Sequence, residues 1–91
     1  MAKAKKNIIG AQLSELRRVN QLSQEELAAI CRDHGWQLTR DVLARMETHV
    51  RCVADFELLL IADILKVPVT EILPPPGSWK QIRKDYLRSA V

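Results

Sequence analysis

The sequence predicts an all-α fold, and three observations support this expectation. Leu, Ala and Ile supply most of the apolar residues, whereas aromatic residues make up only 4% of the 91-residue chain, a balance that favours helices over strands. Apolar residues recur at spacings of three and four, as they do on one face of a helix. Capping residues and glycine stand where such helices would begin and end. The apolar share of 47% is enough for one core, so we expect a single compact domain.

The first two helices are predicted between residues 8 and 35. The first covers about residues 8–19, and its apolar positions are Ile9, Leu13 and Leu16. The second begins at Ser23 with a capping box, in which the Ser23 hydroxyl accepts from the Glu26 amide and the Glu26 carboxylate accepts from the Ser23 amide. Gly35 is a typical helix stop, so the second helix ends there.

Three more helices are predicted before the proline run. Thr39 can cap a third helix that continues to about Thr48. Asp55 can cap a fourth helix, almost wholly apolar, that continues to about Lys66. A short fifth helix is expected at about residues 70–73. Two brief connections join the first three helices, and a polar, non-periodic stretch around His49 and Arg51 precedes the fourth.

The proline run at residues 74–76, with Gly77 after it, separates the core from the tail. Ser78 and Gln81 again have capping-box spacing, and the apolar residues that follow them predict a tail helix. We therefore divide the chain into a basic arm (residues 1–7), a core domain (8–73), and a proline linker with a basic tail helix (74–91).

Charge is unevenly distributed along the chain. The net charge of +3 divides into +4 for residues 1–19, −4 for residues 20–73 and +3 for the remainder. A Lys-rich arm and a basic tail suit contact with a polyphosphate, although solvated chain ends are also often basic. Cys31 and Cys52 are too few for a disulfide framework or a four-ligand zinc site, and we expect reduced thiols, with Cys31 in the core.

Four segments of the sequence carry a resemblance to a known protein family. They are the opening IGAQLSELRR, the second-helix start LSQEELAAI, the third helix LTRDVLARME and the closing LLLIADILKVPVTEIL. In this order they resemble the Cro and phage-repressor (XRE) family of helix-turn-helix DNA-binding regulators. The resemblance implies a five-helix lambda-repressor-like DNA-binding domain, here with a C-terminal tail helix. It also implies that a recognition helix at about residues 39–48 lies in the major groove of double-stranded DNA.

The resemblance implies base and backbone contacts from this third helix. Arg40 is the candidate for a bidentate contact to guanine, worth roughly 1 to 3 kcal/mol of discrimination. Asp41 could accept from cytosine, or it could hold Arg40 or Arg45 in place. The structural alternative is a solvated helical face, with Asp41 and Arg45 paired one turn apart.

The resemblance also implies contacts around the start of the second helix. Gln24 matches the family position that binds a phosphate and braces the recognition helix, and Ser23 would help bind the same phosphate. Arg17 and Glu47 match a structural pair that locks the first helix to the recognition helix. The full set expected to contact DNA is Arg17, Ser23, Gln24, Thr39, Arg40, Asp41, Arg45 and Arg51.

Two features depart from the family pattern. The connection at residues 32–38 is about five residues longer than the usual tight turn, which can shift the angle of the third helix. Arg40 and Arg45 are therefore better candidates for contacting DNA than for reading a named base. His49 stands where the family commonly has glycine in a left-handed turn.

The fourth helix has two apolar faces. One face is expected in the core and consists of Leu58, Ile61, Ala62 and Leu65. Leu60 and Ile64 would then lie on the opposite side and need a cover. The tail helix could supply it through Trp79 and Ile82, or the same surface of a second subunit could, and we expect a homodimer.

We interpret the sequence as a sequence-specific regulator of transcription that binds double-stranded DNA, in particular a repressor. One alternative is a protein-interaction module, such as an antitoxin or anti-repressor, that uses Leu60, Ile64 and the tail. Another is RNA binding through the basic ends. There is no recognisable nucleophile and base, so we expect a non-enzyme with no cofactor, metal or small-molecule ligand. The absence of a long apolar run predicts a cytoplasmic protein with no membrane partner.

Overall fold

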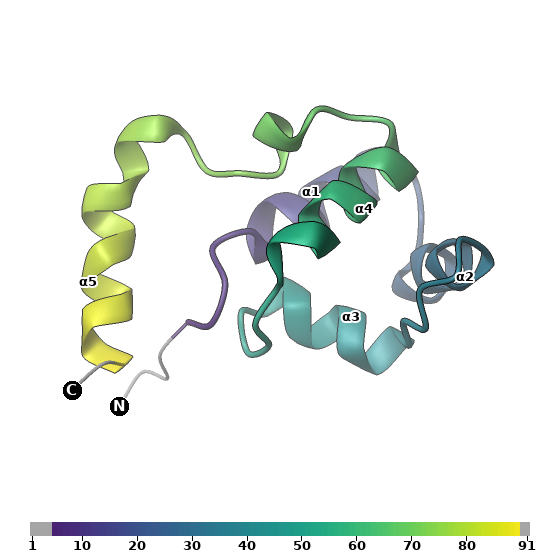
Figure 1. Ribbon diagram of the computed structural model, residues 1–91, viewed down its shortest axis with the longest axis horizontal. Helices are drawn as coiled ribbons and strands as arrows, with labels where there is room; N and C mark the ends of the chain where they lie inside the picture. The colour runs from purple at the N-terminus through teal and green to yellow at the C-terminus, as the bar shows by residue number, and fades with distance from the viewer. Residues whose placement is uncertain (1–4, 90–91) are drawn as a thin grey trace.

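The computed structural model describes the backbone of residues 5–89 and the side chains of residues 5–84. Over this range the chain forms helices and no strand, so the predicted all-α class is confirmed. The first four helices form a bundle, and the last stands to one side of it (Figure 1). The elements are α1 (Gly10–Val19), α2 (Gln24–Asp33), α3 (Arg40–Glu47), α4 (Asp55–Leu65), the 3₁₀ turns η1 (Val69–Glu71) and η2 (Pro76–Ser78), and α5 (Trp79–Ser89).

The core lies where the first four helices and η1 meet. Leu43 and Met46 of α3 are fully buried in it, as the helical pattern predicted. The other core residues are Ile9, Leu13, Leu27, Cys31, Leu38, Ile61, Ala62, Leu65 and Ile72. Burial raises the pKa of the Cys31 thiol to about 11, whereas Cys52 is exposed between α3 and α4. No helix in the described range is long and apolar enough to cross a membrane.

The starts of α2 and α3 follow the predicted caps. The Ser23 hydroxyl accepts from the Glu26 amide at 3.0 Å, and the Glu26 carboxylate accepts from the Ser23 amide at 2.8 Å. The Thr39 hydroxyl accepts from the Val42 amide at 3.2 Å. Each cap supplies a partner to an amide that has none inside its helix.

Three predicted boundaries are wrong. Asp55 is the first residue of α4 and not its cap; Glu57 instead accepts from the Ala54 amide at 2.9 Å, because a carboxylate three residues into the helix reaches back. The fifth helix is only the single 3₁₀ turn η1. Ser78 lies inside η2, where its hydroxyl donates to the Pro75 carbonyl at 2.6 Å, so it does not act as the predicted cap.

The ends of α1 to α4 share one backbone motif. A left-handed residue follows each helix, and the next amide then donates to a carbonyl five residues earlier, as in a Schellman motif. The left-handed residues are Gln21, Gly35, His49 and Lys66, with φ of 57°, 89°, 66° and 58°. His49 therefore adopts the conformation for which the family commonly uses glycine. Gly35 alone among the four is free of the steric cost that a Cβ brings to this conformation.

The outward face of α4 differs from the predicted one. Ile64 is half-buried and packs against the core, and Leu60 is half-buried. The residues that point into solvent are Phe56 and Leu59, which are 60% and 64% exposed. The tail does not cover this face through Ile82, because Ile82 lines a hollow with Ile8 at the start of the described chain.

Candidate nucleic-acid interface

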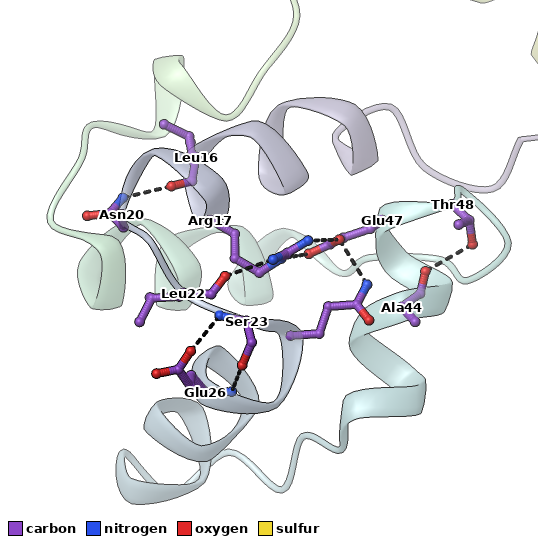
Figure 2. Close-up of polar contacts among 10 residues, drawn as sticks. Leu16, Arg17, Asn20, Leu22, Ser23, Glu26, Ala44, Glu47 and Thr48 are labelled. Carbon is purple, nitrogen blue, oxygen red and sulfur yellow. Dashed lines mark hydrogen bonds and ion pairs between the residues drawn. The ribbon is translucent and has the colours of Figure 1, made fainter.

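The carboxyl end of α3 is tied to α1 and α2 through one buried carboxylate. Glu47 Oε2 lies 2.7 Å from Arg17 Nε, and Glu47 Oε1 accepts from Arg17 Nη2 and from Gln24 Nε2, both at 3.1 Å. The remaining guanidinium nitrogen, Arg17 Nη1, donates to the Leu22 carbonyl at 2.7 Å (Figure 2). The structure thus brings Arg17 and Glu47 together as the resemblance implied, and it adds Gln24 to the same carboxylate.

Burial makes this cluster rigid. The side chains of Arg17 and Glu47 are only 12% and 5% exposed. The hydrogen bond to Glu47 is the main cause that raises the pKa of Arg17 above its ordinary value; the negative charge of Glu47 adds to this, while burial opposes it. A bidentate arginine–carboxylate pair fixes both position and orientation. The end of α3 is therefore held in one geometry relative to the first two helices.

Gly10 permits the close approach of α1 to the same end of α3. A Cβ at Gly10 would lie 2.6 Å from the Met46 carbonyl oxygen and 2.7 Å from that of Glu47. Both atoms belong to backbone and cannot move aside easily. Only glycine fits at this position without displacing one helix from the other.

Asn7 is a buried residue that the sequence patterns did not single out. Its Nδ2 donates to the carbonyls of Met46 (3.0 Å) and Arg51 (2.8 Å). Its Oδ1 accepts from the amides of Ile9 (3.1 Å) and Gly10 (2.9 Å) at the start of α1. One side chain therefore joins the amino-terminal arm to α1, to α3 and to the segment after α3. An asparagine just before a helix was the signal available in the sequence, because asparagine is a common capping residue.

The amino end of α3, by contrast, is open to solvent. Arg40 and Asp41 are 61% and 81% exposed, and Arg40 Nη1 lies 3.7 Å from Asp41 Oδ1, a loose contact. Arg45 lies one turn further along the helix and is also exposed. In residues 5–84, no hydrogen bond or ion pair holds the Arg45 side chain, so the alternative pairing with Asp41 does not form there. Thr39, Arg40, Asp41 and Arg45 together leave a polar, cationic helix face accessible.

Ser23 lies at the amino end of α2, next to Gln24, which contacts Glu47 at the carboxyl end of α3. The Ser23 hydroxyl oxygen accepts from the Glu26 amide in the capping box. The hydrogen bonds from Ser23 lower the pKa of Glu26 below its ordinary value, first through the backbone amide and then through the side chain. Glu26 is therefore a stable anion that completes the helix start.

Arg51 has a partner within the chain. Its guanidinium pairs with the buried carboxylate of Glu57, with both nitrogen–oxygen distances at 3.2 Å, and it also donates to the Cys52 carbonyl at 3.0 Å. About a third of the Arg51 side chain stays exposed. The resemblance placed this residue among backbone contacts, and the structure shows that it also joins the segment after α3 to α4.

The long connection between α2 and α3 is ordered by one arginine. Arg32 donates to the Leu38 carbonyl at 2.8 Å and to the Glu25 carboxylate at 2.7 Å. Trp36 is half-buried and packs against the core, while Leu38 is fully buried. These contacts fix the start of α3 relative to α2 in spite of the added length.

No family model matches the chain, and no curated protein matches it. Among solved structures, the chain is similar to one described as the crystal structure of the DNA-binding domain of BldD. The two are 27% identical, the TM-score is 0.63, and the match covers 81% of this chain and all of that one. The fold of this chain is therefore that of a known DNA-binding domain.

Proposed function

We propose that this chain is a sequence-specific double-stranded DNA-binding regulator of transcription that acts as a repressor, with α3 as its recognition helix. The observation that carries the proposal is the construction of α3. Its carboxyl end is fixed by a buried ion pair, and its amino end presents free polar and cationic side chains. A helix that enters the major groove by its amino end needs both properties.

In this proposal some residues at the two helix starts contact bases and others contact phosphates. Arg40 carries two parallel donors that match the N7 and O6 acceptors of guanine. Ser23 and Thr39 donate their hydroxyl protons to phosphates at the two helix starts. Arg45 adds a cationic contact one turn along α3.

Gln24 has a double role in the same proposal. One Nε2 hydrogen is donated to Glu47, at 3.1 Å, and the second remains for a phosphate. Arg17 acts through Glu47 as a positioning residue, since its guanidinium is almost wholly buried. Arg51 keeps its bond to Glu57 and directs its exposed side to the DNA backbone. The phosphate contacts set the position of α3, and α3 supplies the discrimination.

Selection of bound duplexes from a random pool tests the proposal. We expect one enriched motif, and Arg40→Ala should lose roughly 5- to 150-fold of the preference for it, the equivalent of about 1 to 3 kcal/mol. Gln24→Ala should weaken binding to all duplexes alike. Lys66→Ala, at the far end of α4, is the matched control for lost charge. Enrichment of no motif, or an unchanged preference in Arg40→Ala, would contradict the recognition role of α3.

We further propose that residues 8–73 form the DNA-binding unit, flanked by the arm and the tail, and that the chain is a homodimer. Phe56 and Leu59 form an exposed apolar pair on α4, which supports a subunit interface there in place of the expected Leu60 and Ile64. Leu59→Asp should shift sedimentation toward the monomer, while Val19→Asp, on an equally exposed apolar residue of α1, should not.

The same apolar pair favours one second function, a protein-interaction module with weak or no DNA binding. The duplex selection separates the two. A chain that enriches no motif but loses its self-association in Leu59→Asp would be an interaction module. A chain that enriches a motif with two symmetric half-sites would be a dimeric DNA reader.

A further inference from the structure

We infer that α5 is a second DNA-binding element, in which Lys80, Arg83 and Lys84 bind phosphates that flank the segment contacted by α3. The inference rests on the proposed function, because it extends the same interface. It adds a basic surface that neither the resemblance nor the structural similarity assigns, and it predicts a longer binding site.

The cations of α5 lie on the side turned away from the bundle. Lys80 and Lys84 are one helical turn apart, with Arg83 next to them, and all three are exposed. Ile82 is half-buried and faces the opposite way, against Ile8 and the prolines. Lys80 Nζ lies 5.9 Å from the ring centre of Trp79. Within the side chains that the structure describes, no carboxylate pairs with these cations.

The connection between the bundle and α5 is stiff enough to hold this basic surface in place. Three consecutive prolines, residues 74–76, connect it to the bundle, and the η2 turn leads directly into it. Ile82 and Gln81 line the same hollow as Asn7 and His49. The tail therefore sits against the segment that Asn7 anchors to the end of α3, and its position is coupled to that of α3.

Helix α5 runs from its amino end, which carries Lys80, toward the edge of the molecule at which α3 lies, with Arg83 and Lys84 near its middle (Figure 1). In Figure 1, α5 stands at one end of the long axis and α2 at the other, and the carboxyl end of α5 reaches the same edge of the molecule as α3. The long dimension is 39 Å, compared with about 34 to 36 Å for one turn of B-DNA. A duplex that lies along this dimension would therefore meet α5 and α3 within about one turn.

The charge distribution shows why such a contact is needed. Residues 20–73, which include α2, α3 and α4, carry a net charge of −4. The positive excess of the protein lies in its two ends, at +4 and +3. A domain whose reading helix belongs to a net-negative segment needs cations elsewhere to release counterions from DNA. Lys80, Arg83 and Lys84 of α5 supply such cations.

A charge-neutral variant of the full chain tests the inference. Lys80→Gln, Arg83→Gln and Lys84→Gln are combined, and binding to two duplexes is measured against salt. One duplex holds the selected motif alone and the other adds long flanks of arbitrary sequence. The charge-retaining control combines Lys80→Arg, Arg83→Lys and Lys84→Arg. Circular dichroism establishes that both variants keep the helical fold.

We expect the neutral variant to bind the flanked duplex about 10- to 100-fold more weakly near physiological salt. Its slope of log affinity against log salt should fall by about 2 to 3, since each phosphate contact contributes about 0.9. Its preference for the motif should stay unchanged, and the charge-retaining control should bind like the unaltered chain.

Three other results overturn the inference. An unchanged affinity and slope in the neutral variant would leave the proposed function standing and remove α5 from the interface. Equal losses on the short and the flanked duplex would place the cations away from the flanks. Binding to single-stranded RNA is measured in parallel, and a loss there with no loss on either duplex would assign α5 to another partner. Failure of the unaltered chain to bind any duplex would instead refute the proposed function itself.

Discussion

The two ends of α3 are built in opposite ways. At the carboxyl end, Glu47 is buried and receives three hydrogen bonds from α1 and α2. At the amino end, Arg40 and Asp41 are largely exposed and lie 3.7 Å apart. At each end of α3 an arginine lies next to a carboxylate of α3, and at the carboxyl end that arginine, Arg17, belongs to α1. Residue type therefore does not distinguish the two ends. Burial does, because a desolvated pair fixes geometry and a solvated pair contributes little to stability.

This difference separates the residues that hold the helix from those that remain free to bind. A reading helix works only if it reaches DNA in one orientation, and the buried end provides that orientation in advance. The free end keeps its side chains available for a partner. Variants of the charged side chains at each end should therefore affect different measurements: stability at the carboxyl end and binding at the amino end.

Glu47→Ala should have the largest effect on stability. It removes the partner of a buried arginine, which typically costs about 3 to 5 kcal/mol. Urea denaturation measures the free energy of unfolding. Asp41→Ala is the matched control at the other end, and we expect a change within about 0.5 kcal/mol. Equal losses at the two ends would contradict the distinction.

Gly10→Ala should cause the second-largest loss of stability. The added Cβ would meet the Met46 and Glu47 carbonyl oxygens at 2.6 and 2.7 Å, so α1 must move away from the fixed end of α3. Overpacking of this kind costs about 1 to 3 kcal/mol. Gly77→Ala is the control, because a Cβ at that position would meet nothing within 4 Å. The thermal midpoint of Gly77→Ala should stay close to that of the unaltered chain.

Thr39→Ala sharpens the comparison at the open end. It removes the hydroxyl that accepts from the Val42 amide, and loss of such a cap costs about 1 kcal/mol. Thr70→Ala, at an exposed position of η1, should change stability by less than half of that. Amide hydrogen exchange at the first turn of α3 should quicken in Thr39→Ala, and unchanged exchange there would argue against the cap.

Lys66→Gly and His49→Gly test the turns that end α4 and α3. Lys66 has φ of 58°, so glycine should raise stability by about 0.5 to 1 kcal/mol in thermal unfolding. His49 has φ of 66°, but its Nδ1 also donates to the Asn7 carbonyl at 3.0 Å. His49→Gly should therefore gain less than Lys66→Gly, and an equal gain would mean that this hydrogen bond contributes nothing.

Glu26→Gln should produce the smallest effect, visible only as a pH dependence. The folded pKa of Glu26 is lowered, so its contribution is present above the ordinary carboxyl pKa and is lost as the pH falls through the lowered value. The acid side of the stability curve should be flatter in Glu26→Gln than in the unaltered chain.

Local signals predicted most of the helices. Ser23 with Glu26, and Thr39 with the apolar residues after it, encode helix starts through neighbours in the sequence. The predicted start of the fourth helix was wrong by one residue. Two acidic residues, Asp55 and Glu57, stand close together, and the carboxylate of Glu57 is the one that caps the helix. Ser78 misled because a proline turn competes for the same hydroxyl. Which partner such a side chain takes depends on the local backbone geometry, and the spacing of residues in the sequence does not specify that geometry.

Contacts between distant residues were harder to predict. Arg17, Gln24 and Glu47 could be grouped only through the family resemblance, since their separations carry no local pattern. Asn7 was missed because its partners lie across the fold, at Met46 and Arg51. The outward face of α4 was misjudged because nearly all its residues are apolar, and periodicity then gives no preferred direction.

Asn7 also offers a direct view of how the fold assembles. Its Nδ2 donates to two carbonyls about forty residues further along the chain, so these two hydrogen bonds exist only when the amino-terminal segment has docked on α3. The two Nδ2 protons should accordingly give separate, slowly exchanging NMR resonances in the native state. The denaturant concentration at which these resonances are lost would report when the two helices separate, independently of the helix content.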